Sequence, residues 1–262
     1  MNYGFTMGTA GVIAAMHRQD VASNNLANIQ TVGYKPDTSF TIPRQAARQE
    51  DGLMNMPSNT LLERLGAGVL LAPNRTSFTQ GSLTQTRNPF DVAIQGDGFL
   101  TVSGGADTAA GGDSLRLTRD GRMTVDTRGH LVTVTDGRDI LDETGRPILV
   151  NPASDFTVHT NGSITQGGSE IAKLGFIDVP NRDSLKKVGN NMFSLSAAAA
   201  TSKTVATGNV LQYNVEESGA DPIRAMMAVQ SAADAVGTTS KIMQIHDDLM
   251  NRAINTLGHV TA

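Results

Sequence analysis

Residues of the types that most often perform chemistry are scattered through this sequence. The chain of 262 residues contains five histidines and no cysteine. No two histidines form a His-x-x-x-His pair, and zinc sites need several nitrogen or sulfur ligands at short, fixed spacings. His246 and Asp247 are adjacent, so on a helix their side chains point about 100° apart. The pattern therefore indicates surface or structural histidines: His17, His130, His159, His246 and His259.

Motifs for phosphate binding and nucleophilic catalysis are also missing from the sequence. There is no Gly-x-x-x-x-Gly-Lys-Ser/Thr run and no Gly-x-Ser-x-Gly run. Gly96-Asp97-Gly98 lies between two predicted strands, whereas a phosphate cradle precedes a helix. The Asp-Gly pairs lack the acidic spacing of a calcium-binding EF-hand loop. We therefore expect no enzyme activity, no cofactor, no metal and no small-molecule substrate.

Charge and composition exclude further classes of protein. The net charge is -4 without a cluster of lysines and arginines, which argues against binding to nucleic acid. No apolar run is long enough to predict a transmembrane helix, and no basic start followed by an apolar stretch predicts a cleaved signal peptide. The absence of cysteine fits a protein that travels unfolded into an oxidising compartment.

One polar stretch stands out near the start of the chain. Asn24, Asn25 and Asn28 lie close together in a helical pattern that Gly33 ends, with Tyr34 following. Asparagine is a poor residue for the interior of a solvated helix, because its amide competes for backbone hydrogen bonds. We expect this stretch to be a contact surface whose amides find their partners only in a packed assembly.

The helix that carries this stretch has an apolar seam. From residue 3 to about 30, residues recur at alternating steps of four and three, as in a coiled coil. The seam consists of Gly8, Val12, Ala15, Gln19, Ala22, Leu26 and Ile29. Because these side chains are small or polar, the helix is marginal alone and needs a close partner.

A second and longer helix is predicted at the other end of the chain. Asp221 is a helix N-cap and Pro222 suits the first helical position. A heptad seam runs through Met226, Val229, Ala233, Val236, Ser240, Met243, Asp247, Met250, Ile254 and Leu257. A second apolar stripe contains Ile242, Ile245 and Leu249. Two apolar faces on one helix predict two partners, the N-terminal helix and a neighbouring subunit.

The middle of the chain is expected to be β structure. Short β-prone runs alternate with turn signals from about residue 67 to 215. Arg119-Asp120-Gly121 in particular reads as a hairpin turn, and further turns are predicted at Asp126–Gly129 and Asn161-Gly162. The predicted fold is mainly β with long terminal helices that pair as a coiled coil, with the all-β hairpin domain inserted between them. The predicted parts are an N-terminal helix and motif (1–36), an extended arm or loop (37–66), the β domain (67–215) and a C-terminal helix (216–262).

Four blocks of residues resemble the axial proteins of the bacterial flagellum, specifically the rod proteins of the basal body. The first block is Ser23-Asn-Asn-Leu-Ala-Asn28 with Gly33-Tyr34-Lys35, where the family usually has Gly-Phe-Lys. The second block extends from Gln80 to Phe99. The third begins at Thr118-Arg119-Asp120-Gly121, and the fourth joins Val210-Leu211 to Glu216-Glu217-Ser218. The blocks follow the family's order along nearly the whole chain, whose length suits a distal or proximal rod protein.

The chain departs from the family near its C-terminus. Members usually have an Asn-Val-Asn-like turn before the last helix and an Arg-x-Tyr-Glu pattern within it. Here the corresponding residues are Ser218-Gly-Ala-Asp221-Pro222 and Gln230-Ser-Ala-Ala-Asp234-Ala-Val236. The subunit contacts of that Arg and Tyr are therefore not carried over to this chain.

The resemblance implies a structural subunit that polymerises helically into the flagellar drive shaft. The implied partners are copies of itself, other rod and hook subunits, the surrounding ring proteins and the flagellar export apparatus. The implied location is the basal body in the periplasm, reached without a cleaved signal peptide. The predicted subunit interface comprises Asn24, Asn25, Leu26, Asn28, Gly33, Tyr34, Met226, Val229, Val236, Met243, Met250 and Ile254.

Alternative functions remain open at this stage. One is a hook-type axial protein, although hook proteins generally carry extra domains. Another is a secreted β-rich binding or adhesin module on a coiled-coil stalk, with a ligand-binding loop at 104–112. An enzyme ranks third, because it would need an acidic or histidine cluster on one face of the β domain.

Overall fold

The computed structural model describes residues 3–45, 68–104, 115–195 and 204–258. Most of the predicted arm and nearly all of the loop at 104–112 lie outside these described residues. The chain forms two compact units. Unit 1 consists of Met1–Ala27, Asp37–Arg75 and Pro222–Ala262, and unit 2 consists of Asn28–Pro36 and Thr76–Asp221.

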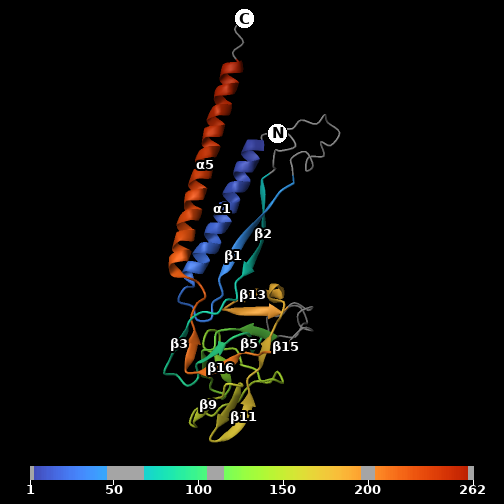
Figure 1. The fold of residues 1–262 in the computed structure, drawn as a ribbon, viewed down its shortest axis with the longest axis vertical. Helices are drawn as coiled ribbons and strands as arrows, with labels where there is room; N and C mark the ends of the chain where they lie inside the picture. Colours follow the sequence, from blue (N-terminus) through green and yellow to red (C-terminus); the bar gives the residue numbers. More distant parts are fainter. Residues whose placement is uncertain (1–2, 46–67, 105–114, 196–203, 259–262) are drawn as a thin grey trace. The chain divides into compact units, whose positions relative to one another are not determined.

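The described residues of unit 1 form two helices and a two-stranded sheet (Figure 1). Its elements are α1 (Tyr3–Ala27), β1 (Asp37–Pro43), β2 (Val69–Thr76) and α5 (Pro222–Gly258). Helix α5 begins at Pro222, as predicted from the proline at that position. Strand β1 lies inside the predicted arm and pairs with β2, so this part of the arm is regular structure. Neither described helix has an apolar stretch that could cross a membrane.

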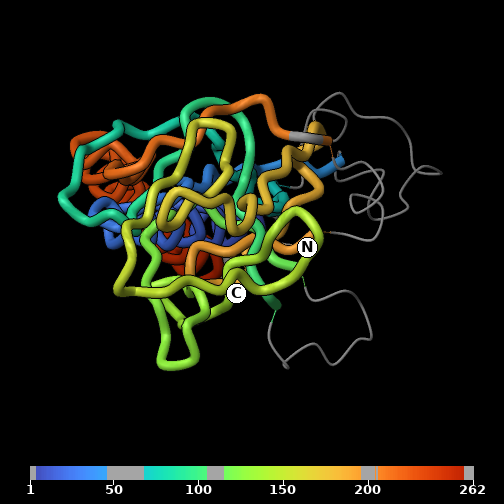
Figure 2. Tube along the Cα trace, turned by 90° about the horizontal axis from the view of Figure 1, so that it is seen from below, coloured from blue at the N-terminus to red at the C-terminus, as the bar shows by residue number. Residues whose placement is uncertain are grey.

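The two helices of unit 1 run antiparallel and lie side by side in both views (Figures 1 and 2). Gly4, Gly8 and Gly11 of α1 face His246, Met243 and Thr239 of α5 in turn. A Cβ atom built on Gly8 would lie 2.7 Å from Met243 Cγ, so glycine permits the close approach of the two helices at this point. The terminal helices therefore pack together, while supercoiling of the pair stays a prediction.

The residues buried in the described part of α1 are three alanines and Val21, and two of the alanines belong to the predicted seam. Ala15 and Ala22 belong to that seam and are buried, as is Ala14 beside it. On α5, Ala225 and Ala232 are buried. Small side chains let two helix backbones approach closely, but each contributes little apolar area. The pair therefore gains its stability from many small contacts.

The described residues of unit 2 form an all-β body of short strands, with one short 3-10 helix, η2 (Arg182–Ser184). Its largest sheet has six strands in the order β13-β14-β6-β5-β12-β15. The strands of this sheet are β5 (Phe99–Ser103), β6 (Leu115–Thr118), β12 (Phe176–Asp178), β13 (Leu185–Gly189), β14 (Met192–Leu195) and β15 (Thr204–Val205). A three-stranded sheet, in the order β11-β10-β9, contains β9 (Phe156–Val158), β10 (Ser163–Gln166) and β11 (Ser169–Lys173).

Three strand pairs complete unit 2 and link distant parts of the sequence. Strand β3 (Leu83–Gln85) pairs with β17 (Asn214–Glu216), β4 (Val92–Gln95) with β16 (Asn209–Gln212), and β7 (Met123–Val125) with β8 (Leu131–Thr133). The first two pairs place the end of the β segment beside its beginning. One mainly aliphatic core is buried within this unit, and a smaller core stacks Phe78, Phe99 and Phe193.

The predicted hairpins are partly confirmed. The turn at Asp126–Gly129 joins the paired strands β7 and β8, and Asn161-Gly162 joins β9 and β10. The hairpin predicted at Arg119-Asp120-Gly121 is wrong, because β6 pairs with β5 and β14 while β7 pairs with β8. Gly121 packs so closely on the Val92 carbonyl that a Cβ would lie 1.8 Å from its oxygen. The segment is therefore a packed corner between two sheets.

Candidate functional site

The end of the N-terminal motif is bound into unit 2 by main-chain groups. The Gly33 amide donates to the Glu216 carbonyl at 2.7 Å, and the Gly219 amide donates to the Tyr34 carbonyl at 2.9 Å. The Ser77 amide donates to the Pro36 carbonyl at 2.8 Å. These bonds join three segments that are far apart in sequence. The motif is thus an integral part of the β unit, although it directly follows helix α1 along the chain.

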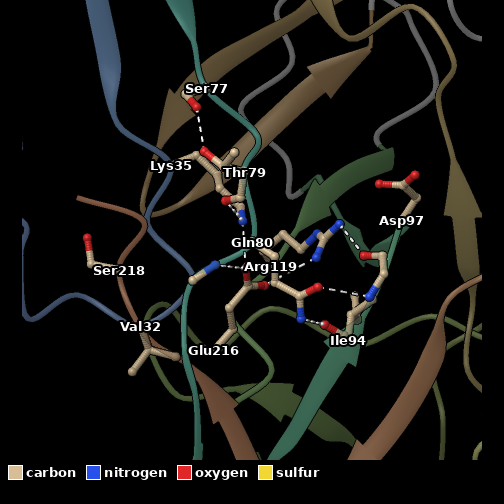
Figure 3. A network of polar contacts seen from close by, with 12 residues as sticks. Val32, Lys35, Ser77, Thr79, Gln80, Ile94, Asp97, Arg119, Glu216 and Ser218 are labelled. Carbon is tan, nitrogen blue, oxygen red and sulfur yellow. Dashed lines mark hydrogen bonds and ion pairs between the residues drawn. The ribbon is translucent and has the colours of Figure 1, made fainter. Parts of the chain in front are cut away.

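A buried carboxylate lies at the centre of this junction (Figure 3). Glu216 Oε1 lies 2.6 Å from Lys35 Nζ, and Glu216 Oε2 lies 3.2 Å from Arg119 Nη1. The side chain of Glu216 is 0% exposed, that of Lys35 1% and that of Arg119 2%. Buried charges are rare unless they are paired, so the three residues form a mutually dependent cluster. We call Lys35, Arg119 and Glu216 the ion cluster.

Further hydrogen bonds join the ion cluster to main-chain groups in the second sequence block or directly before it. Lys35 Nζ donates to the Thr79 carbonyl and Arg119 Nη2 donates to the Gly96 carbonyl, each at 2.9 Å. The Gly81 amide donates to Glu216 Oε1 at 3.0 Å. Gln80 beside it bridges the Ile94 carbonyl and the Gly96 amide. Residues in or next to all four sequence blocks therefore converge on one site.

The electrostatics of the ion cluster leave one positive charge in excess. Burial lowers the pKa of Lys35, and the neighbouring Glu216 carboxylate acts in the opposite direction. Burial likewise lowers the pKa of Arg119, again opposed by Glu216. The Arg119 guanidinium also lies 5.2 Å above the Phe99 ring, which favours a cation. A single carboxylate thus compensates two buried cations, and the cluster depends on Glu216 above all.

Gly33 is required by the shape of this junction. Its φ of +70° lies in the left-handed region that favours glycine. A Cβ at this position would lie 2.7 Å from the carbonyl carbon of Arg119 and from the amide nitrogen of Asp120. The next residue, Tyr34, is buried, and Lys187 Nζ lies 4.6 Å above its ring. Both Gly33 and Tyr34 are therefore packed inside the chain.

The side chains of Asn25 and Asn28, which were predicted to find their partners in an assembly, find partners within their own chain. In unit 1, Asn25 Nδ2 donates to the Asp37 carbonyl at 2.8 Å and Asn25 Oδ1 accepts from the Asp37 amide at 3.0 Å. In unit 2, Asn28 Oδ1 accepts from Thr31 Oγ1 at 3.1 Å. The expectation that these amides are satisfied only in an assembly is therefore wrong for Asn25 and Asn28. Asn24 is exposed and Leu26 is half-buried.

The predicted interface residues of the C-terminal helix fall into two groups. Val229, Val236 and Met243 are half-buried in unit 1, and Met243 faces Gly8. Met226, Met250 and Ile254 are exposed in the isolated chain. A role of the twelve predicted residues in subunit contacts remains a prediction.

Sequence reasoning missed the ion cluster itself. Lys35, Arg119 and Glu216 all lie in the blocks that carry the resemblance, yet a single charged residue in a turn or strand gives no sign of burial. The available signal was the presence of one acidic and two basic residues in three of the blocks that carry the resemblance. In the described part of the chain, no group of three His, Cys, Asp or Glu residues is arranged to hold a metal ion.

Comparison with known proteins matches both the motif and the whole chain. The family model described as "Flagella basal body rod protein" matches residues 7–35. The flagellar basal-body rod protein FlgF of Caulobacter vibrioides is 28% identical over 262 residues, which cover 99% of this chain and 100% of that protein.

Relatives named FlgG also match nearly from end to end. The flagellar basal-body rod protein FlgG of Agrobacterium fabrum is 28% identical over 93% of this chain and 95% of that protein. FlgG of Bacillus subtilis is 26% identical over 95% of this chain and 96% of that protein. The motif match and the end-to-end matches agree: the chain is similar along almost its whole length to the flagellar basal-body rod proteins.

Proposed function

We propose that this chain is a structural subunit of the flagellar basal-body rod, which polymerises helically into the drive shaft that transmits torque from motor to hook. The observation that carries the proposal is the end-to-end match with relatives named flagellar basal-body rod protein. The matched residues cover 99% and 93% of this chain, so the proposal covers nearly the whole chain.

The architecture supports this function in two ways. The terminal helices of unit 1 pack through small residues and leave apolar side chains exposed, among them Met226, Met250 and Ile254. A contact that does not close into a ring joins such subunits into an open helical polymer. In unit 2, the ion cluster ties the residues that follow α1 to those that precede α5. A subunit that transmits torque needs rigid contacts with its neighbours and a rigid junction within unit 2.

The partners follow from this role. We infer contacts with further copies of the chain, with other rod and hook subunits, and with the ring proteins around the rod. Export through the flagellar apparatus in an unfolded state suits a chain without cysteine, since no disulfide can form during transit. The inferred location is the periplasmic part of the basal body, without cleavage of a signal peptide.

Electron microscopy of the purified chain at increasing concentration tests the proposal. Rods or tubes with helical order are expected, because self-association buries the exposed apolar residues. Discrete closed oligomers would favour an adhesin-like module and would contradict the proposed function. Sedimentation of the same samples quantifies the polymer.

A further inference from the structure

An apolar groove lies in unit 1 between the first half of helix α1 and strand β2. It has a volume of about 580 Å³ and is lined chiefly by Phe5, Thr9, Ile13, Arg44, Leu70 and Leu71. Ile13 is 50% exposed and Leu70 52% exposed. In the described part of unit 1, β1 and β2 form a two-stranded sheet, and a two-stranded ribbon is marginal without further apolar cover. The groove is thus an apolar site that the described part of its own chain leaves open to solvent.

Helix α5 carries an exposed apolar stripe, and the lining of the groove is likewise mainly apolar. Ile242, Ile245 and Leu249 are 58%, 51% and 58% exposed. At about 100° per residue, this stripe is roughly a quarter-turn away from Met243 and His246, which face α1. Helix α1 therefore does not cover it. A side-by-side row of three large aliphatic residues is the kind of helix face that fills a hydrophobic groove.

The stripe of the same chain does not reach the groove. The glycine side of α1, at Gly4, Gly8 and Gly11, already packs against α5. The groove side, at Phe5, Thr9 and Ile13, is nearly opposite on the α1 surface at about 100° per residue. One helix cannot occupy both sides, so an α5 helix that fills the groove must come from another copy.

We propose that the groove of one copy receives the Ile242–Ile245–Leu249 stripe of a second copy. Charge supports this occupant. Arg44 is the charged residue among the described residues that line the groove, and Asp248 lies between Ile245 and Leu249 at the edge of the stripe. Lys241 and Arg252 lie toward the two ends of the stripe. The groove and the stripe are different surfaces, so the contact is heterologous and propagates from copy to copy.

The absence of native cysteine makes disulfide cross-linking a direct test on the full chain. One preparation carries Ile13→Cys and a mass-tagged second preparation carries Leu249→Cys. The two are mixed under mild oxidation. The matched control replaces the second protein by Gln244→Cys, an exposed position off the stripe. All three positions are exposed, so the variants are expected to fold, as circular dichroism checks.

The mixed Ile13→Cys and Leu249→Cys pair should yield at least five times more cross-linked heterodimer than the control pair. Arg44→Glu should lower that yield, and adding Asp248→Arg to the Leu249→Cys partner should restore it. Arg18→Glu, outside the groove, should leave it unchanged. Equal yields in both pairs, or cross-linking of Leu249→Cys mainly to itself, would overturn the proposal.

This inference rests on the proposed function, because the contact would build the polymer. Sedimentation of the wild-type chain separates the two claims. Sedimenting rods without the expected heterodimer would overturn the groove contact and leave the rod function intact. Heterodimer that forms only closed, non-sedimenting oligomers would support the groove contact and contradict the rod function.

Discussion

Glu216 is the residue on which the junction within unit 2 depends. Its carboxylate accepts from Lys35 at 2.6 Å, from Gly81 at 3.0 Å and from Arg119 at 3.2 Å. Breaking a buried ion pair by removing one partner is costly, since the remaining charge loses its compensation. Replacing both partners costs less, because no isolated charge is left behind.

Glu216→Gln is therefore expected to lower the free energy of unfolding by about 3–5 kcal/mol. The double variant with Lys35→Met should recover part of that loss, because only one buried cation then remains unpaired. Urea denaturation of both variants measures the effect.

Glu217→Gln is the matched control for that measurement. The neighbouring Glu217 carboxylate accepts from the hydroxyls of Ser82 and Thr84 on an exposed surface, and these bonds lower its pKa. Its replacement should cost clearly less than that of Glu216. Equal losses for both variants would show that Glu216 has no special role.

Gly33 provides a second prediction at the residue scale. Gly33→Ala should cost about 2–5 kcal/mol, from left-handed strain of about 1–2 kcal/mol and crowding against the Arg119–Asp120 peptide of about 1–3 kcal/mol. Gly137 is the matched control, because its φ is +66° but nothing lies within 4 Å of its Cβ position. Thermal unfolding of both alanine variants should show a distinctly smaller loss for Gly137→Ala, and similar losses would refute the packing argument.

Asp126 gives a prediction about pH. Hydrogen bonds from the Arg128 side chain and the His130 amide lower the pKa of Asp126 from 3.8 to about 2. Because the pKa in the folded state is the lower one, the ionised carboxylate stabilises the fold above pH 3.8, and this stabilisation is lost as pH falls toward 2. The stability gap between the wild type and Asp126→Asn should thus be constant near neutral pH and shrink below pH 3.8. Urea denaturation across this range tests it, and a gap that does not change with pH would contradict it.

At the scale of elements, the α1–α5 pair depends on close approach at glycine. Gly8→Leu should destabilise the helix pair by about 1–3 kcal/mol, as overpacking does. Met243→Ala in the same chain should relieve part of the loss, because Met243 Cγ is the nearest atom to a Cβ at position 8. Helical circular dichroism during thermal unfolding measures both. Gly237→Leu, with nothing within 4 Å, is the control and should not lower stability.

Elements with a strong periodic pattern could be predicted from the sequence. The helix start at Pro222 and the turn at Asn161-Gly162 follow from local rules, since a proline or an Asn-Gly pair acts on its own neighbours. The corner at Arg119-Asp120-Gly121 follows the same local rule and yet is no hairpin. Its conformation depends on contacts with residues that are distant in sequence: Arg119 pairs with Glu216, and Gly121 packs on the Val92 carbonyl.

The candidate site was predicted less well than the fold for the same reason. Asn25 was recognised as a residue that needs a partner, but the partner is the backbone of Asp37 in the same chain. Lys35 and Glu216 are separated by 181 positions, and no local pattern reports that they pair. Long-range pairing of single charges needs the fold, whereas periodic apolar seams do not.

At the scale of the whole molecule, the two units have different expected roles. Unit 2 contains the ion cluster that stabilises the fold, and unit 1 contains the terminal helices that we expect to assemble. Unit 2 contains Asn28–Pro36. This segment includes Gly33, and it includes Lys35, which is a member of the ion cluster. Removal of residues 1–27 therefore keeps the ion cluster, while removal of residues 1–36 deletes Lys35 and leaves Glu216 without that partner. The first truncation should retain a folded β unit and the second should destabilise it.

The most direct test of the account compares the full chain with the variant that lacks residues 1–27, by sedimentation and electron microscopy at the same concentrations. The account predicts rods from the full chain. It predicts a soluble, non-polymerising variant whose β unit still unfolds cooperatively, because the helix partner of α5 is gone while the ion cluster is kept. Normal rods from the truncated variant, or a full chain that stays monomeric at every concentration, would contradict the claim that the terminal helices assemble this subunit into the rod.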